Sequence, residues 1–182
     1  MRTAHNVSDD TLIKAGHRLL SALFASYDFP LFFRDDDPDP LHDFLQFEHE
    51  EISENLLTIS AISRALDDEV GRLEAIEPNF PKGVGWLQTQ GANQEPLCIR
   101  DACNKIIHAK VVKYDFAWIE ENPIWGKWYK DQGFEVRKQY KAPAVNLEGE
   151  HQSGKKWSAR VELSRSYWRC HYATCGNGNW PR

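Results

Sequence analysis

The sequence predicts an α+β fold, in which a bundle of three or four helices forms the core and a C-terminal antiparallel β-hairpin or small sheet packs on it. Apolar residues recur every three or four positions in three segments before residue 110, which is the spacing of amphipathic helices. After residue 111, apolar and polar residues alternate, as in half-buried strands. We therefore expect one domain over residues 1–182, helical over about 9–110, β-rich over about 111–170 and ending in a loose tail over 171–182.

The composition narrows the classes of protein to which the chain can belong. Its 182 residues, 41% hydrophobic and 27% charged, suit a folded domain rather than a disordered one. The formal charge of -5 argues against extensive electrostatic binding to nucleic-acid phosphates, although it does not exclude a local basic groove. The sequence contains no apolar run of transmembrane length and no signal-peptide core, so we expect a cytoplasmic protein without membrane contact.

The helical spacing predicts two long helices in the first half of the chain. Acidic N-cap residues precede an apolar stripe that predicts a helix from about Asp9 to Ala25. A narrower stripe runs from Leu41 to about Ile76, where an unbroken helix would be about 50 Å long. We expect this second helix either to break near Asp67-Asp68 or to protrude and help to build a dimer.

Two acidic groups are candidate metal ligands. Asp35–Asp37 lacks the alternating spacing and the glycine of an EF-hand loop. Glu48–Glu51, with His42 and His49 nearby, lacks the paired E-x-x-H motifs of a four-helix carboxylate site. We interpret the first group as a solvated loop and the second as a solvated acidic face, and we predict no metal and no cofactor. A metal-dependent enzyme that uses these acids is a further alternative.

The four cysteines are a third candidate metal site. Cys98 and Cys103 repeat the spacing of Cys170 and Cys175, whereas structural zinc sites usually use a tighter C-x2-C pair. Two residues five apart on a helix also point about 140° away from each other. We interpret all four as reduced thiols, most of them buried as small hydrophobic groups.

The second half of the chain contains the clearest strand signal. We expect a loop over Pro78–Glu95, because prolines, glycines and amides interrupt the pattern there. Further on, the sequence predicts an antiparallel hairpin with its apolar side inward. Apolar and polar residues alternate over Val145–Gly149 and again over Trp157–Leu163, and a turn lies between them at His151–Gly154.

Residues 97–112 contain the strongest candidate for a catalytic or binding site in the sequence. Read as a helix that starts after Pro96, this stretch aligns Arg100, Asn104 and His108 at intervals of four, so that a cation, an amide and an imidazole share one face. An imidazole suits proton transfer near neutral pH, and a guanidinium can stabilise a phosphorane-like transition state. The same side chains could instead lock the helix to the preceding loop and the following strand, and both interpretations stay open.

Over Cys103–His108, together with the Trp-containing hairpin that follows, the chain resembles the HEPN superfamily. HEPN proteins are all-α and often act as ribonucleases, or as nucleotidyltransferase partners, in toxin–antitoxin and antiphage systems. Their motif is an arginine followed directly by a polar residue, often Asn, and after four to six residues by a histidine. Asn104 and His108 match the polar residue and the histidine, Cys103 stands at the arginine position, and Arg100 lies one turn earlier.

The resemblance implies a metal-independent endoribonuclease in which the motif helices of two subunits face each other. His108 would act on the ribose 2′-OH or the leaving oxygen, with Arg100 and Asn104 as the other candidate catalytic residues, and the partners would be RNA or an antitoxin. The alternative is a non-catalytic interaction or regulatory module, in which these residues form a structural clamp. In either case we expect a homodimer through the long helix or the motif helix.

Overall fold

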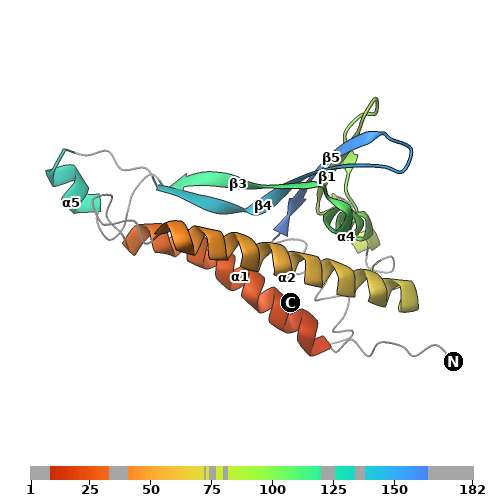
Figure 1. The fold of residues 1–182 in the computed structure, drawn as a ribbon, viewed down its shortest axis with the longest axis horizontal. Coiled ribbons are helices and arrows are strands. Elements are labelled where there is room, and N and C mark those ends of the chain that lie inside the picture. The colour runs from red at the N-terminus through yellow and green to blue at the C-terminus, as the bar shows by residue number, and fades with distance from the viewer. Residues whose placement is uncertain are drawn as a thin grey trace.

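The structure is a two-layer arrangement of helices on an antiparallel sheet (Figure 1). It is a computed structural model that describes residues 9–32, 41–71, 73, 77–79, 82–119, 126–133 and 138–163. Within these ranges, three helices have ten or more residues: α1 (Asp9–Phe32), α2 (Leu41–Val70) and α4 (Ile99–His108). A short helix, α5 (Gly126–Asp131), follows later in the chain. The predicted α+β class is therefore confirmed.

The helix α2 is continuous over its 30 residues and ends at Val70, two residues after Asp68 and before the predicted end near Ile76. Gly71 follows the helix, and its φ of 65° lies in the left-handed region that favours glycine. The Gly71 N–H donates to the Asp67 carbonyl at 2.7 Å, which satisfies one of the last carbonyls of the helix. Figure 1 shows α1 and α2 side by side in one layer, and α1 extends beyond the predicted end at Ala25.

The sheet has five strands in the order β2-β1-β5-β4-β3, all antiparallel. The strands are β1 (Gly85–Thr89), β2 (Glu95–Pro96), β3 (Val111–Ile119), β4 (Lys138–Glu150) and β5 (Lys156–Glu162). The predicted hairpin is confirmed as β4 and β5, with Val145 opposite Val161 and Leu147 opposite Ala159.

The expectation that the sheet is only a C-terminal element was wrong. The strands β1 and β2 come from the segment for which we expected a loop, and β1 pairs with β5 along its whole length. Pro96 lies in β2 instead of directly preceding the motif helix. That helix runs over Ile99–His108 and not over the predicted residues 97–112, because β3 begins at Val111. Proline is tolerated in β2 because β2 is an edge strand.

The strand β4 contains a bulge that divides the sheet into two parts. Tyr114 pairs with Val145 and Phe116 pairs with Lys141, so three residues of β4 lie opposite Asp115 alone. One of the three is Pro143, a residue that sheets tolerate at bulges. Before the bulge β4 pairs only with β3, and Figure 1 shows this two-stranded ribbon lying over α1 and α2.

The core lies between the helices and one face of the sheet. Alternate residues of β4 and β5 face the helices, and these are Val145, Leu147, Trp157, Ala159 and Val161. The helices contribute apolar residues at helical spacing, among them Leu12, Leu19, Ile52, Leu56, Ala102 and Cys103. Within the described residues, no helix is both long enough and apolar enough to cross a membrane.

Candidate functional site

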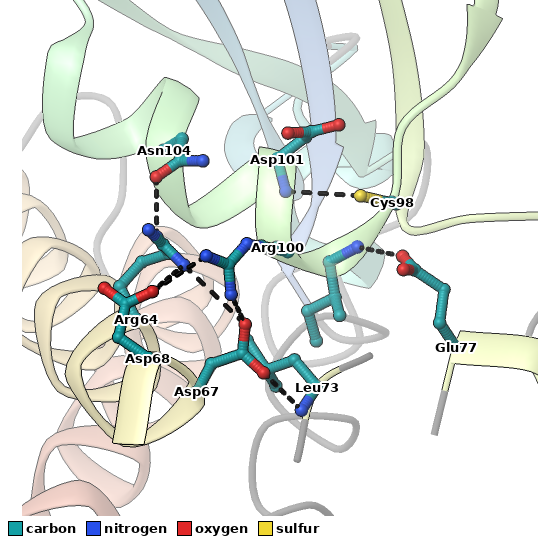
Figure 2. A network of polar contacts seen from close by, with 10 residues as sticks. Arg64, Asp67, Asp68, Leu73, Glu77, Cys98, Arg100, Asp101 and Asn104 are labelled. Atoms are coloured by element: carbon teal, nitrogen blue, oxygen red, sulfur yellow. Dashed lines mark hydrogen bonds and ion pairs between the residues drawn. The ribbon is translucent and has the colours of Figure 1, made fainter. Parts of the chain in front are cut away.

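The helix α4 packs against the C-terminal end of α2, and Arg100 makes the central contact (Figure 2). Its guanidinium forms an ion pair with Asp67 and a second one with Asp68, in which Arg100 Nη2 lies 2.7 Å from Asp68 Oδ1. The Asp67 side chain is fully buried, whereas that of Asp68 is about half exposed. Arg100 is therefore bound at the junction of two helices.

Asn104, one turn further along α4, also faces α2. Its Oδ1 accepts a hydrogen bond of 2.7 Å from Arg64 Nε, and Arg64 Nη1 lies 3.0 Å from Asp68 Oδ1. Two arginines and two aspartates thus form a cluster in which the formal charges cancel. We call these four residues, together with Asn104, the α2–α4 clamp.

The α2–α4 clamp also contacts the segment that follows α2. Asp67 Oδ1 accepts a hydrogen bond of 2.8 Å from the Leu73 N–H, so one buried carboxylate serves both the helix junction and the turn after it. The first N–H of α4, that of Ile99, donates to Glu77 Oε1 at 3.2 Å. Sequence reasoning missed Arg64, Asp67 and Asp68 as partners, although an arginine three and four residues before two aspartates is a spacing that indicates ion pairs on a helix.

The structure separates His108 from this cluster. His108 is the last residue of α4 and is exposed, and its imidazole has no hydrogen bond or ion pair with the described residues. Eight residues of helix separate it from Arg100, which corresponds to about 12 Å along the axis. Of the three predicted site residues, Arg100 and Asn104 are therefore bound to α2, and His108 faces solvent.

The cysteines of α4 have structural surroundings. Cys98 is the N-cap, and its Sγ accepts a hydrogen bond of 3.3 Å from the Asp101 N–H. The pKa of this thiol is raised to about 12, mainly by burial and also by the neighbouring Glu77 and Asp101 side chains, whereas the hydrogen bond from the Asp101 N–H acts in the opposite direction. Cys103 is buried in the core, and Cys170 and Cys175 lie outside the described residues.

The candidate metal groups are only partly visible. Asp35–Asp37 and the side chain of His42 lie outside the described part of the chain. Among the residues that are described, no three histidine, cysteine or acidic side chains are grouped so that they could hold a metal ion.

The expectation of a solvated acidic face was wrong for Glu48. This residue is buried, and its Oε2 lies 2.6 Å from the Nζ of Lys141, whose side chain is also buried. The backbone N–H of Lys141 donates to Ser26 Oγ of α1 at 2.9 Å, because the ribbon part of β4 has no β5 partner on that edge. Sequence reasoning missed this second polar cluster, which binds the ribbon to both long helices.

The face of the sheet that points away from the helices is polar. The strand register places Gln88, Ser158, Glu148 and Val111 in one row across β1, β5, β4 and β3. An open cavity of about 450 Å³ lies over this end of the sheet. Its lining contains amide, hydroxyl, ammonium and carboxylate groups, contributed by Gln88, Gln90, Ser158, Lys110, Lys156, Glu148 and Glu150. Apolar surface, including that of Val111 and Trp157, completes the lining.

Three of the four charged residues that line this cavity, Lys110, Glu148 and Glu150, form ion pairs on the surface. Lys110 Nζ lies 2.6 Å from Glu150 Oε2, and Lys113, next to the cavity, lies 2.6 Å from Glu148 Oε1. All four side chains are at least one-third exposed, so each pair contributes little to stability and can be exchanged for other partners at low cost. Comparison with protein-family models, with curated proteins and with solved structures finds no match to this chain.

Proposed function

We propose that the protein is a non-catalytic interaction module, in which α4 is held by the α2–α4 clamp and a partner protein binds the open polar face of the sheet. The observation that carries this proposal is the bonding of Arg100 to both Asp67 and Asp68. A phosphate could use this guanidinium only by displacing two carboxylates, one of them fully buried, and a buried carboxylate that loses its partner is costly.

The open face supports a peptide-like partner. The cavity offers hydrogen-bond donors and acceptors together with both signs of charge, which suits the mixed groups of a polypeptide. Glu148 and Glu150 balance Lys110 and Lys156 in this lining, so the cavity has no net positive charge to attract the phosphates of a nucleic acid. The surface lysines and glutamates can exchange their present partners for those of a bound chain.

A metal-independent ribonuclease of HEPN type is the second candidate function. One observation favours it: the imidazole of His108 is exposed and is not bonded to the described residues, so a substrate could reach it. In this candidate function His108 would act as the proton-transfer group, and a cation other than Arg100 would have to stabilise the transition state.

Two substitutions separate the two functions. Under the interaction-module proposal, Arg100→Ala lowers the melting temperature, because it removes the closer of the two guanidiniums from the buried Asp67 carboxylate and leaves only Arg64, at 3.6 Å. His108→Ala changes neither stability nor any RNA cleavage above background. Cleavage of RNA by the purified protein that is lost in His108→Ala, with an unchanged melting temperature, would establish the ribonuclease and contradict the module.

The partner surface is tested with a photo-crosslinking amino acid placed at Ser158 in cells that produce the protein. Ser158 lies in the cavity lining, and Lys14, exposed on α1, is the matched control position. We expect a discrete protein crosslink from Ser158 and none from Lys14. Crosslinks of equal strength from both positions, or none from Ser158, would argue against a partner at this face.

A further inference from the structure

The strand β3 forms one edge of the sheet and has unusual apolar exposure. It is the last strand in the order β2-β1-β5-β4-β3 and is nine residues long. Val112 is 40% exposed and Phe116 is 52% exposed. The extra residues of the bulge belong to β4, so the backbone of β3 itself is regular. A long, regular, apolar edge strand is a ready template for pairing with another strand.

The side chains of β3 divide cleanly between the two faces of the sheet. Tyr114 points toward the helices, where its hydroxyl lies 2.5 Å from Ser53 Oγ of α2. By alternation Val112 and Phe116 share that face. Lys113 and Asp115 lie on the opposite face, where Lys113 pairs with Glu148, and Asp115 pairs with Arg160 and accepts a hydrogen bond from Asn146.

We propose that two copies of this chain pair through their β3 strands, antiparallel and about a two-fold axis at Tyr114, so that the two sheets become one. Two residues that lie opposite each other in such a pair must have their side chains on the same face of the joined sheet. Because side chains alternate between the faces, the two-fold axis must pass through a residue and not between two residues. An axis at Lys113 would set two lysines opposite each other, and one at Asp115 would set two aspartates opposite each other, both of which are unfavourable.

The axis at Tyr114 gives complementary neighbours instead. Lys113 lies opposite Asp115 of the second copy, and Val112 lies opposite Phe116 of the second copy. Lys113 already pairs with Glu148 of its own chain, and Asp115 already pairs with Arg160 of its own chain. The new contact between Lys113 and Asp115 of the second copy joins these pairs into a row of alternating charge on the open face. Opposite charges and apolar pairs directly across a ladder each stabilise it.

The helix below β3 extends the apolar area of this surface. Leu57 of α2 is 49% exposed and lies one helical turn after Ser53, which contacts Tyr114. A two-fold axis through Tyr114 therefore brings Leu57 toward its counterpart, together with Val112 and Phe116. This proposal does not depend on the proposed function. It does not use the α2–α4 clamp, and it shares with the cavity only Glu148, whose ion pair with Lys113 is already present in the single chain.

The pairing is tested by the oligomeric state of the full chain and by a designed disulfide. We expect light scattering after size exclusion to show a dimer of the wild-type protein at micromolar concentration. In Val112→Lys/Phe116→Lys, two ammonium groups replace the apolar pair, and we expect the dimer dissociation constant to rise about tenfold or more. The matched control is Phe24→Lys on α1. Phe24 is 69% exposed and lies about 200° around the helix from Ser26, the residue that contacts the ribbon, so this substitution leaves the dimer unchanged.

The disulfide fixes the register. In Val112→Cys/Phe116→Cys, the two thiols of one chain are four residues apart on an extended strand, about 13 Å, and cannot bond to each other. Across the proposed axis they lie directly opposite, within disulfide range. We expect mild oxidation to link two copies through residues 112 and 116, with far less linkage in either single variant or in the wild type.

Three results would overturn the proposal. A wild-type monomer at all concentrations up to about 100 μM would mean that the edge stays unpaired. A dimer that survives Val112→Lys/Phe116→Lys, or that is lost in Phe24→Lys, would place the interface elsewhere. A dimer without the 112–116 disulfide would mean a register other than the one that sets Lys113 opposite Asp115, and would contradict the proposed axis.

Discussion

The ammonium group of Lys141 lies 2.6 Å from the carboxylate of Glu48, and both side chains are buried. This pair joins the two-stranded ribbon to α2 at a point where the ribbon has lost its β5 partner. Charges that are removed from water tolerate burial only when each keeps its partner, so the pair fixes how the ribbon sits on the helices.

Breaking this pair should destabilise the protein strongly. Lys141→Met leaves the Glu48 carboxylate buried without a cation, and we expect a loss of about 3–5 kcal/mol in the free energy of unfolding, measured in urea. The double variant Lys141→Met/Glu48→Leu removes both charges and should recover most of that loss. Lys110→Met, which breaks the exposed pair with Glu150, is the control and should change stability far less. A single Lys141→Met variant as stable as this control would contradict the role of the pair.

A second prediction concerns Gly149, which faces Trp157 across β4 and β5. A Cβ atom at this position would overlap the indole, and the indole is itself covered by the Lys105 ammonium, 4.5 Å from the ring centroid. We expect Gly149→Ala to cost about 1–3 kcal/mol through overpacking. In Gly149→Ala/Trp157→Phe the smaller ring leaves room, so the loss should be less than the sum of the single losses. Additive losses in urea unfolding would show that the methyl group finds space elsewhere.

The N-cap role of Cys98 predicts low reactivity toward alkylating agents. With its pKa raised to about 12, the thiol holds very little thiolate at pH 8. We expect iodoacetamide to modify it roughly a thousandfold more slowly in the folded protein than in urea. Trypsin cleaves after Arg100, so mass spectrometry reports Cys98 separately from Cys103. Equal rates in folded and unfolded protein would show that the thiol is not protected.

The pH dependence of stability should reflect His49. Burial lowers the pKa of its imidazole, and the nearby positive charge of Lys141 lowers it further. The folded protein then binds the proton less readily than the unfolded chain, so this contribution to stability is complete above about pH 6.5 and is lost as the pH falls through that value. We expect His49→Gln to lose less stability than the wild type between pH 7 and pH 5, measured in urea.

The control for this pH profile is His17→Gln, an exposed position on α1 that contacts Ser21. It should follow the wild-type curve. A His49→Gln profile parallel to that of the wild type would remove His49 as a contributor.

Local patterns in the sequence predicted the elements whose partners lie close by. The hairpin of β4 and β5 follows from alternation around a short turn, and α2 follows from its apolar spacing. The strand β1 was missed because it has only five residues, begins with a glycine and pairs with β5, about 70 residues later in the chain.

The partners of the candidate site residues were likewise not predictable from local sequence patterns. Spacing placed Arg100 and Asn104 on one stripe of α4, which was correct, but it could not show that Asp67 and Arg64 of α2 lie opposite them. For Glu48, the position four residues before the buried Ile52 was a usable signal that it belongs to the inner stripe of α2. Its partner Lys141 lies 93 residues further along and has no local signature.

The pairing of β1 with β5 has a consequence for synthesis of the protein. Residues 85–89 leave the ribosome long before residues 156–162, so β1 must wait for its main partner while the helical half can already form. The sheet cannot close until the last strand emerges. A chain that stops short of residue 156 would leave β1 with only the two-residue β2 beside it, and would expose both an unpaired strand and the apolar faces of α1 and α2 to aggregation.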